Sequence, residues 1–154
     1  MSMKPQRFLF IAIFLVLSSP VCLSQTKNKP VQANNPSNAK SSPAYAEVLL
    51  QKTELLSELE SLLIDYKEDF PKVKELRYET GLLQKELDRI LAVNPADASK
   101  LTTALGKLMV RRCELGANLW SLQIQFNDEH PDVKRAKRKL EFFDAAINEI
   151  LQNK

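Results

Sequence analysis

The chain has 154 residues, of which 44% are hydrophobic, with 22 Lys or Arg against 19 Asp or Glu. This near balance of charge excludes a global nucleic-acid-binding surface. A single His and three Gly, all within helical pattern, argue against a metal cluster or a phosphate-cradling loop. We therefore expect no enzyme activity, no cofactor and no metal.

Residues 1–24 are predicted to be a secretory signal peptide. Two basic residues precede the ten-residue apolar run FLFIAIFLVL, which is too short to span a bilayer comfortably. Small side chains at Cys22 and Ser24 place the cleavage between Ser24 and Gln25. We therefore expect an exported protein that is periplasmic or secreted and meets the membrane only through this transient segment.

Two other interpretations of the first residues stay open. Lipidation at Cys22 requires a small residue before the cysteine, where the chain has Val21. An uncleaved membrane anchor is disfavoured by the polar Ser and Pro residues that end the apolar run. Cleavage leaves 20 basic residues (22 less two) against 19 acidic ones, and Cys113 as the only thiol. No internal disulfide is then expected in the exported chain.

Residues 25–42 (QTKNKPVQANNPSNAKSS) are expected to form a disordered linker. Their only large apolar side chain is one Val, so nothing offsets the entropy of ordering them. Helical pattern begins at Pro43 and continues to about Gln152.

The folded part repeats itself at a shift of sixty residues. Residues 44–93 laid over residues 104–153 give twelve identities, and apolar positions step by three and four in both halves. The first hairpin has this seam at Tyr45, Val48, Lys52, Leu55, Leu59, Leu62 and Tyr66, then Val73, Leu76, Thr80, Leu83, Leu87 and Ile90. The second has it at Leu105, Leu108, Arg112, Leu115, Leu119, Leu122 and Phe126, then Val133, Ala136, Leu140, Phe143, Ile147 and Ile150. Such spacing is typical of helices that pack along a heptad seam.

The predicted fold is all-α, with two tandem antiparallel helical hairpins, 43–93 and 94–154, that form a coiled-coil-like four-helix bundle. Further apolar residues widen the stripe beyond a two-stranded seam and are expected to join the core. These are Leu49, Leu56, Leu63, Leu82, Leu91, Phe142 and Leu151.

Prolines mark the expected start of each helix, because Pro at the first helical position lacks an N–H that the helix would leave unpaired. Pro43, Pro71, Pro95 and Pro131 are placed in this way, and a start at Pro95 makes the third helix the longest. With short breaks, neighbouring helices run antiparallel.

The segment FNDEHPDVKRAKRKLEFF resembles the periplasmic coiled-coil segments of bacterial polysaccharide chain-length determinant (co-polymerase) proteins. The resemblance covers about thirty residues in each repeat, through the pattern aromatic-x-x-(D/E)-(H/F)-P-x-V-K. Unlike that family, this chain has no second apolar segment near its C-terminus. The resemblance implies an envelope-side coiled coil and no specific role in polysaccharide assembly.

The residues that suggest chemistry also have structural explanations. His130 precedes Pro131 and is expected to be a turn and capping residue. The acidic pairs Glu68/Asp69 and Asp128/Glu129 lie next to helix starts, where the helix dipole favours negative charge.

Lys52 and Arg112 occupy the same seam position in the two repeats. Either each carries its charge to the rim of the bundle, or each fixes the register by pairing with an acid on another helix. In the first case, replacing both by Leu would raise the melting temperature; in the second it would change the assembly state.

Five bases gather at the start of the fourth helix: Lys134, Arg135, Lys137, Arg138 and Lys139. They are a candidate anion-binding site for a polyanion or a membrane surface. Alternatively, the first repeat, with seven bases and eleven acids between residues 44 and 93, offers acids to compensate them intramolecularly. No aromatic residues interleave the bases, so we expect no nucleic-acid binding.

The third helix carries a second apolar line at Val110, Cys113, Ala117, Trp120 and Ile124. This line is a candidate partner interface. Either the third helix is central and touches two neighbours, or the chain forms a homodimer with Trp120 as the anchor. In a dimer, Cys113 would lie near its symmetry mate and bridge two chains. The favoured function is a structural or protein-interaction module of the bacterial cell envelope with an unidentified protein partner.

Overall fold

A computed structural model describes residues 37–151. The predicted signal peptide and most of the predicted linker lie outside the described residues. The end of that linker is not disordered, because Ser37–Lys40 forms a short helix, α1. Ala39 packs against the core, and its carbonyl accepts hydrogen bonds from the amide and hydroxyl of Ser42.

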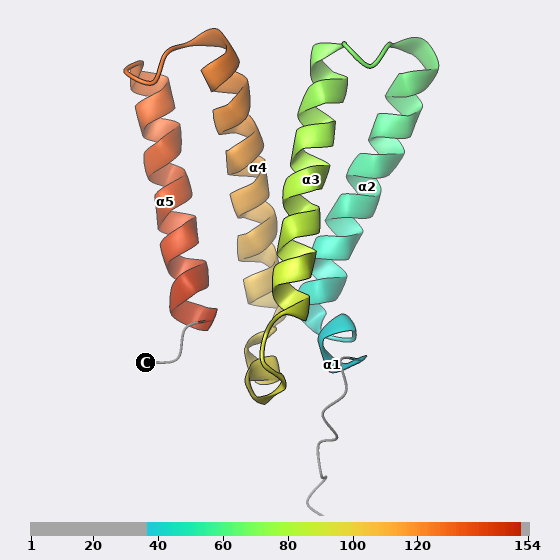
Figure 1. The fold of residues 1–154 in the computed structure, drawn as a ribbon, viewed down its shortest axis with the longest axis vertical. Coiled ribbons are helices and arrows are strands. Elements are labelled where there is room, and N and C mark those ends of the chain that lie inside the picture. Colours follow the sequence, from blue (N-terminus) through green and yellow to red (C-terminus); the bar gives the residue numbers. More distant parts are fainter. Residues whose placement is uncertain (1–36, 152–154) are drawn as a thin grey trace, which may run out of the picture. The chain divides into compact units, whose positions relative to one another are not determined.

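Four long helices follow: α2 (Pro43–Asp65), α3 (Pro71–Leu91), α4 (Thr103–Gln125) and α5 (Pro131–Leu151) (Figure 1). Residues 37–151 contain no strand, so the all-α helical bundle predicted from the sequence is confirmed. The bounds of α4 and α5 are those of α2 and α3 shifted by sixty residues. We call α2 and α3 hairpin 1, and α4 and α5 hairpin 2.

The two hairpin turns repeat one another in detail. Tyr66 stacks on Phe70 with ring centroids 4.2 Å apart, and Phe126 stacks on His130 at 4.1 Å. Pro follows each turn at the first helical position, as predicted. His130 is a capping residue, since its Nδ1 accepts a hydrogen bond from the Asp132 amide at 3.2 Å.

The start predicted for the third helix is wrong. Pro95–Lys100 form a separate 3-10 helix, η1, and α4 begins only at Thr103. The Thr102 hydroxyl accepts a hydrogen bond from the Leu105 amide, just as the Ser42 hydroxyl sixty residues earlier accepts one from Tyr45. These matching caps fix the helix starts, so α4 has 23 residues, as many as α2, and is not longer than it.

The two hairpins meet closely at the end where α2 and α4 begin. A Cβ added at Gly106 would lie 2.8 Å from Cβ of Glu47 and 3.0 Å from Cα of Ala44. The Ala44 amide also donates to the Leu101 carbonyl at 3.2 Å. Glycine is therefore required at position 106 for this approach.

The buried core joins α2, α3 and α4, whereas α5 packs mainly on α4. Seam residues of hairpin 1 such as Leu59 and Leu83 are buried, but the equivalent Leu119 and Phe143 of hairpin 2 are only partly buried. The bundle is thus open on the side of hairpin 2.

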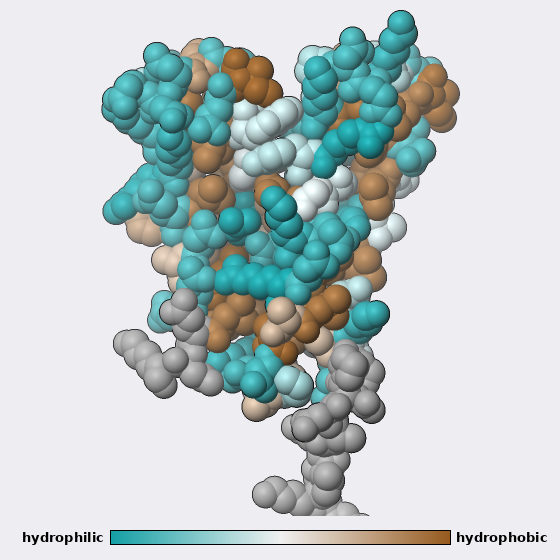
Figure 2. All heavy atoms as spheres, viewed as in Figure 1, coloured by the Kyte–Doolittle hydropathy of each residue, from teal (hydrophilic) through white to brown (hydrophobic). Residues whose placement is uncertain are grey.

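Several residues expected to widen the core stripe stay at the surface. Leu63, Leu82 and Leu151 pack against the core, in agreement with the prediction. Exposed positions are Leu49, Leu56, Leu91 and Phe142, so their assignment to the core is wrong. Figure 2 shows apolar surface among polar atoms along the outer side of α2. Among residues 37–151, no helix has an apolar stretch long enough to cross a bilayer.

Candidate functional site

The second apolar line of α4 is largely covered by the chain itself. Cys113 and Ala117 are buried, Val110 packs against the core, and Trp120 stacks on Tyr78 of α3 with ring centroids 5.0 Å apart. α4 contacts α2, α3 and α5, as the alternative of a central helix predicts. The homodimer interface predicted along this line is therefore wrong for its buried members.

Cys113 is not placed to bridge two chains. Its side chain is fully buried, and burial raises the pKa of the thiol to about 12. The thiol is protonated at neutral pH and out of reach of a second copy, which contradicts the predicted intermolecular disulfide.

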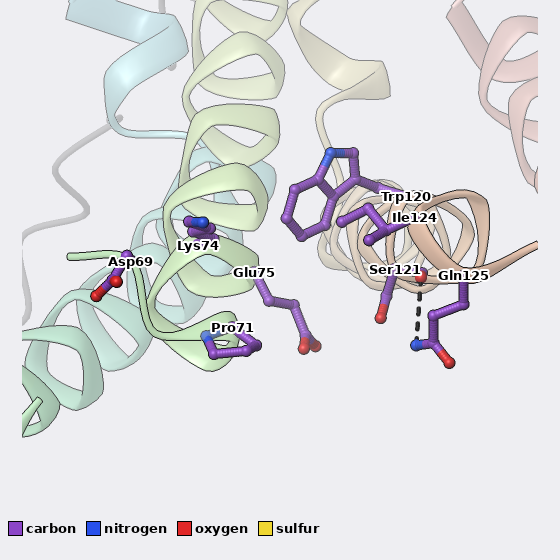
Figure 3. A pocket seen from close by; sticks show the side chains of 8 residues that line it. All are labelled: Asp69, Pro71, Lys74, Glu75, Trp120, Ser121, Ile124 and Gln125. Atoms are coloured by element: carbon purple, nitrogen blue, oxygen red, sulfur yellow. Dashed lines mark hydrogen bonds between the residues drawn. The ribbon is translucent and has the colours of Figure 1, made fainter. Parts of the chain in front are cut away.

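Trp120 and Ile124 remain accessible in a cleft of about 210 Å³ that lies between the start of α3 and the end of α4. Trp120 projects from α4 toward α3, with Ile124 beside it and Pro71 and Glu75 on the opposite wall (Figure 3). We call this the tip cleft. It contains the two members of the predicted interface that line a cleft.

A second depression runs between α4 and α5, and we call it the outer groove. Its volume is about 260 Å³. It is lined by Leu115, Asn118, Leu122, Asp132, Arg135, Ala136 and Lys139. Leu115 and Leu122 are seam positions that stay only partly buried in this groove, whereas the third seam residue, Ala136, is buried.

On hairpin 1 the equivalent surface is filled. The counterparts of Leu115 and Ala136, sixty residues earlier, are Leu55 and Leu76, and both belong to the buried core that α4 completes. α4 thus occupies on hairpin 1 the place that is vacant on hairpin 2. Among the described residues no third hairpin covers hairpin 2 as α4 covers hairpin 1, and this leaves the groove open.

The basic segment at the start of α5 is largely neutralised by acids nearby. Four of its bases pair within α5 or with the preceding turn: Lys134 with Glu129, Arg135 with Asp132, Lys137 with Asp128, and Arg138 with Glu141. The partners come from hairpin 2 and not from the acidic first repeat, which corrects that expectation. Lys139 forms no ion pair with any described residue.

Acidic residues at the two turns form ion pairs that stabilise the hairpins. Glu68 pairs with Arg77, and Asp128 pairs with Lys137 at 2.9 Å, and these two ion pairs are equivalent in the repeat. Hydrogen bonds from Gln123 and Lys137 hold the pKa of Asp128 below its usual value. Each pair ties the turn to the second helix of its hairpin.

Arg112 fits the register-fixing alternative. Its Nε lies 2.6 Å from Oδ1 of Asp144 in α5, and its Nη1 lies 3.2 Å from Oε1 of Glu86 in α3. Burial lowers the pKa of Arg112, but Asp144 and Glu86 together raise it above its ordinary value. Lys52, at the equivalent position, donates to Gln84, the counterpart of Asp144, at the exposed rim. The two seam bases therefore differ in role.

Two buried carboxylates of α3 face α4. The Glu86 side chain is 4% exposed, and its Oε2 has no hydrogen-bond partner. Burial raises the pKa of Glu86 although Arg112 and Arg89 oppose the shift. Burial, then repulsion from Glu114 of α4, raises the pKa of Glu79. The α3–α4 interface thus contains the like charges Glu79 and Glu114 as well as the ion pair between Glu86 and Arg112.

The sequence pattern could have revealed the outer groove. Several residues lining it are seam positions of hairpin 2, and among residues 37–151 no further helix packs over them. Residues 37–151 contain no group of three or more His, Cys, Asp or Glu side chains placed to hold a metal ion.

No protein-family model matches the chain, and neither the curated proteins nor the solved structures compared with it gave a match. The resemblance to polysaccharide co-polymerases therefore stays a prediction.

Proposed function

We propose that this chain is an exported, non-enzymatic helical-hairpin protein that binds another protein in the bacterial cell envelope. The observation that carries the proposal is the outer groove. It leaves Leu115 only partly buried, whereas the counterpart Leu55 on hairpin 1 is buried in the core that α4 completes. A groove between two helices that is apolar at its centre and charged at its rim is suited to receive a helix.

Photo-crosslinking in intact cells tests this function. A photoreactive residue at Asn118 would face the groove, and one at the exposed Lys85 on α3 is the control. We expect a discrete adduct from Asn118 that is absent from Lys85. If Asn118 gives no adduct, or if both positions give the same products, the groove is not a binding site.

The proposed export rests on the sequence pattern of residues 1–24. Mass measurement of the chain recovered from the cell envelope or the medium is expected to show a mature form beginning at Gln25. A chain that keeps its first residues, or one that carries lipid at Cys22, would contradict the assigned cleavage.

Polyanion or membrane-surface binding through Lys134–Lys139 has less support. Four of the five bases in this range already contact acids, and exposed ion pairs of this kind leave little net positive charge locally. Retention of the protein on heparin above physiological salt, lost on changing the five bases to Gln, would favour this alternative.

A further inference from the structure

α2 exposes an apolar face that no described element covers. Leu50 is 58% exposed and Ile64 is 82% exposed, and Leu49 and Leu56 lie on the same exposed side of the helix. Figure 2 shows apolar surface along this outer side. Four large apolar side chains on one face of a single helix are typical of an interaction surface rather than of scattered exposure.

In the repeat, this exposed face of α2 is equivalent to the face of α4 that packs against hairpin 1. Leu49 and Leu50 correspond, at the shift of sixty, to Met109 and Val110. Met109 is buried in the core shared with hairpin 1, and Val110 packs against that core. The chain therefore carries this packing face on both α2 and α4. Among the described residues, only the face on α4 is buried against neighbouring helices.

We propose that a second copy of this chain fills the outer groove, with its α2 packed against α4 and α5 as α4 packs against α2 and α3 within one chain. This inference rests on the proposed function and names the partner. The contact is head-to-tail, because the groove and the α2 face are different surfaces of the chain.

One pair of charges at the proposed contact is complementary where its counterpart inside the chain is repulsive, although the ion pair between Arg112 and Glu86 inside the chain has no equivalent there, because the matching residues are Lys52 and Ala146. Within the chain, Glu114 of α4 repels Glu79 of α3, although Glu114 also pairs with Arg111. At the same positions of the proposed contact, Glu54 of α2 would face Lys139 of α5. Lys139 is also the one base of its segment without an ion pair among the described residues.

A second pair follows the same rule. Trp120 stacks on Tyr78 within the chain, and the equivalent positions are Glu60 on α2 and Arg138 on α5. An aromatic contact inside the chain is thus replaced by an acid and a base between copies. Both substitutions favour the pairing of two chains and orient it.

The proposed contact is wider than its counterpart within the chain. A Cβ added at Gly116 would lie 2.9 Å from Leu82, but α2 has Leu56 at the position equivalent to Gly116. α5 correspondingly has Phe142, 62% exposed, at the position equivalent to Leu82. Leu56 and Phe142 would therefore pack side by side with the helices farther apart than α4 is from hairpin 1.

A head-to-tail contact leaves a free groove at one end of every assembly and a free α2 face at the other. The chain is therefore expected to form assemblies that grow beyond dimers as its concentration rises, unless the ring closes. Sedimentation velocity on the chain purified from the compartment where it accumulates measures this growth.

Two single variants separate a head-to-tail contact from other modes. Leu50→Glu alters the α2 face and leaves the groove intact, and Lys139→Glu alters the groove and leaves the α2 face intact. Each residue is exposed, so both variants are expected to keep the helical content and melting curve of the parent. Each variant alone should associate about tenfold or more weakly than the parent. An equimolar mixture should give a dimer and nothing larger, because only one good contact is available.

The pair Glu54→Lys and Lys139→Glu gives an independent check. Each single change is expected to weaken association, and the double change in one chain is expected to restore it. Lys85→Glu makes the same change of charge on an exposed part of α3 and is expected to have no effect.

Three outcomes overturn the proposal: a parent chain that stays monomeric at every concentration, association lost with Leu50→Glu but unaffected by Lys139→Glu, or a double variant that stays as weak as its singles. A monomeric parent that nevertheless crosslinks through Asn118 to a different protein would refute only the self-association and leave the proposed function standing.

Discussion

Replacing Arg112 by Leu is expected to destabilise the fold by about 2–3 kcal/mol, although the change puts an apolar residue at a seam position. Removing one partner of a buried ion pair leaves the other charge without compensation, at a cost of about 3–5 kcal/mol. Glu86 is that charge, with 4% of its side chain exposed. After the change, its nearest base is Arg89 at 3.8 Å.

Three features reduce the loss below the full range. Asp144 is 37% exposed, so its contact with Arg112 is worth only about 0–1 kcal/mol. Burial of the new Leu contributes about 1 kcal/mol in the opposite direction. Glu86 can also take up a proton, and this sets a limit on the penalty of its charge.

Urea unfolding followed by far-UV circular dichroism measures the loss, with Lys52→Leu as the matched control. Lys52 occupies the equivalent seam position but donates to the neutral Gln84 amide at an exposed rim, so its change is expected to stay within about 0.5 kcal/mol of the parent. Equal effects of the two variants, or a more stable Arg112→Leu, would refute the role assigned to the buried pair.

Four further results are expected. Gly106→Ala should lower the free energy of unfolding by about 1–3 kcal/mol because the added Cβ meets backbone atoms of α2, and urea unfolding measures this. Gly81→Ala, where a Cβ meets nothing within 4 Å, should raise it by up to about 1 kcal/mol, and a loss at Gly81 would contradict the packing described. Cys113 should react with a thiol reagent only as fast as the chain unfolds, and rapid labelling of the native protein would show that it is not buried. Glu79 has a raised pKa in the fold, so the stability that it contributes is present below its unfolded pKa and lost as pH rises through its folded pKa. Glu79→Gln should therefore flatten the fall of stability between mildly acidic and neutral pH, and an unchanged pH profile would refute that assignment.

The sequence predicted the elements well where one local signal decided them. Pro43, Pro71 and Pro131 begin helices as expected, because Pro fits the first turn and disfavours helix before it. The helix start predicted at Pro95 was wrong, because Pro95 begins a 3-10 helix and Thr102 caps the start of α4. The repeat carried the correct signal, because Thr102 lies sixty residues after the cap Ser42.

The candidate site was harder to predict because it depends on which helices are neighbours. The apolar line through Cys113 and Trp120 must be covered by something, and periodicity does not distinguish a helix of the same chain from one of a second chain. The ion pairs of Arg112 likewise required knowing that α4 lies between α3 and α5. Pattern fixes which face of a helix is buried but not which residue lies opposite.

The two versions of the groove contact differ in what must hold them together. α4 is tied to hairpin 1 by the short segment 92–102, so its effective concentration there is high and the contact tolerates the repulsion between Glu79 and Glu114. A second copy has no such connection, and the proposed contact therefore depends on attraction between Glu54 and Lys139. Because that pair lies near the surface, the proposed assembly should weaken as salt is added while the fold of each chain stays intact. The change from Glu79 in one repeat to Lys139 in the next is the substitution that a contact between separate chains would require.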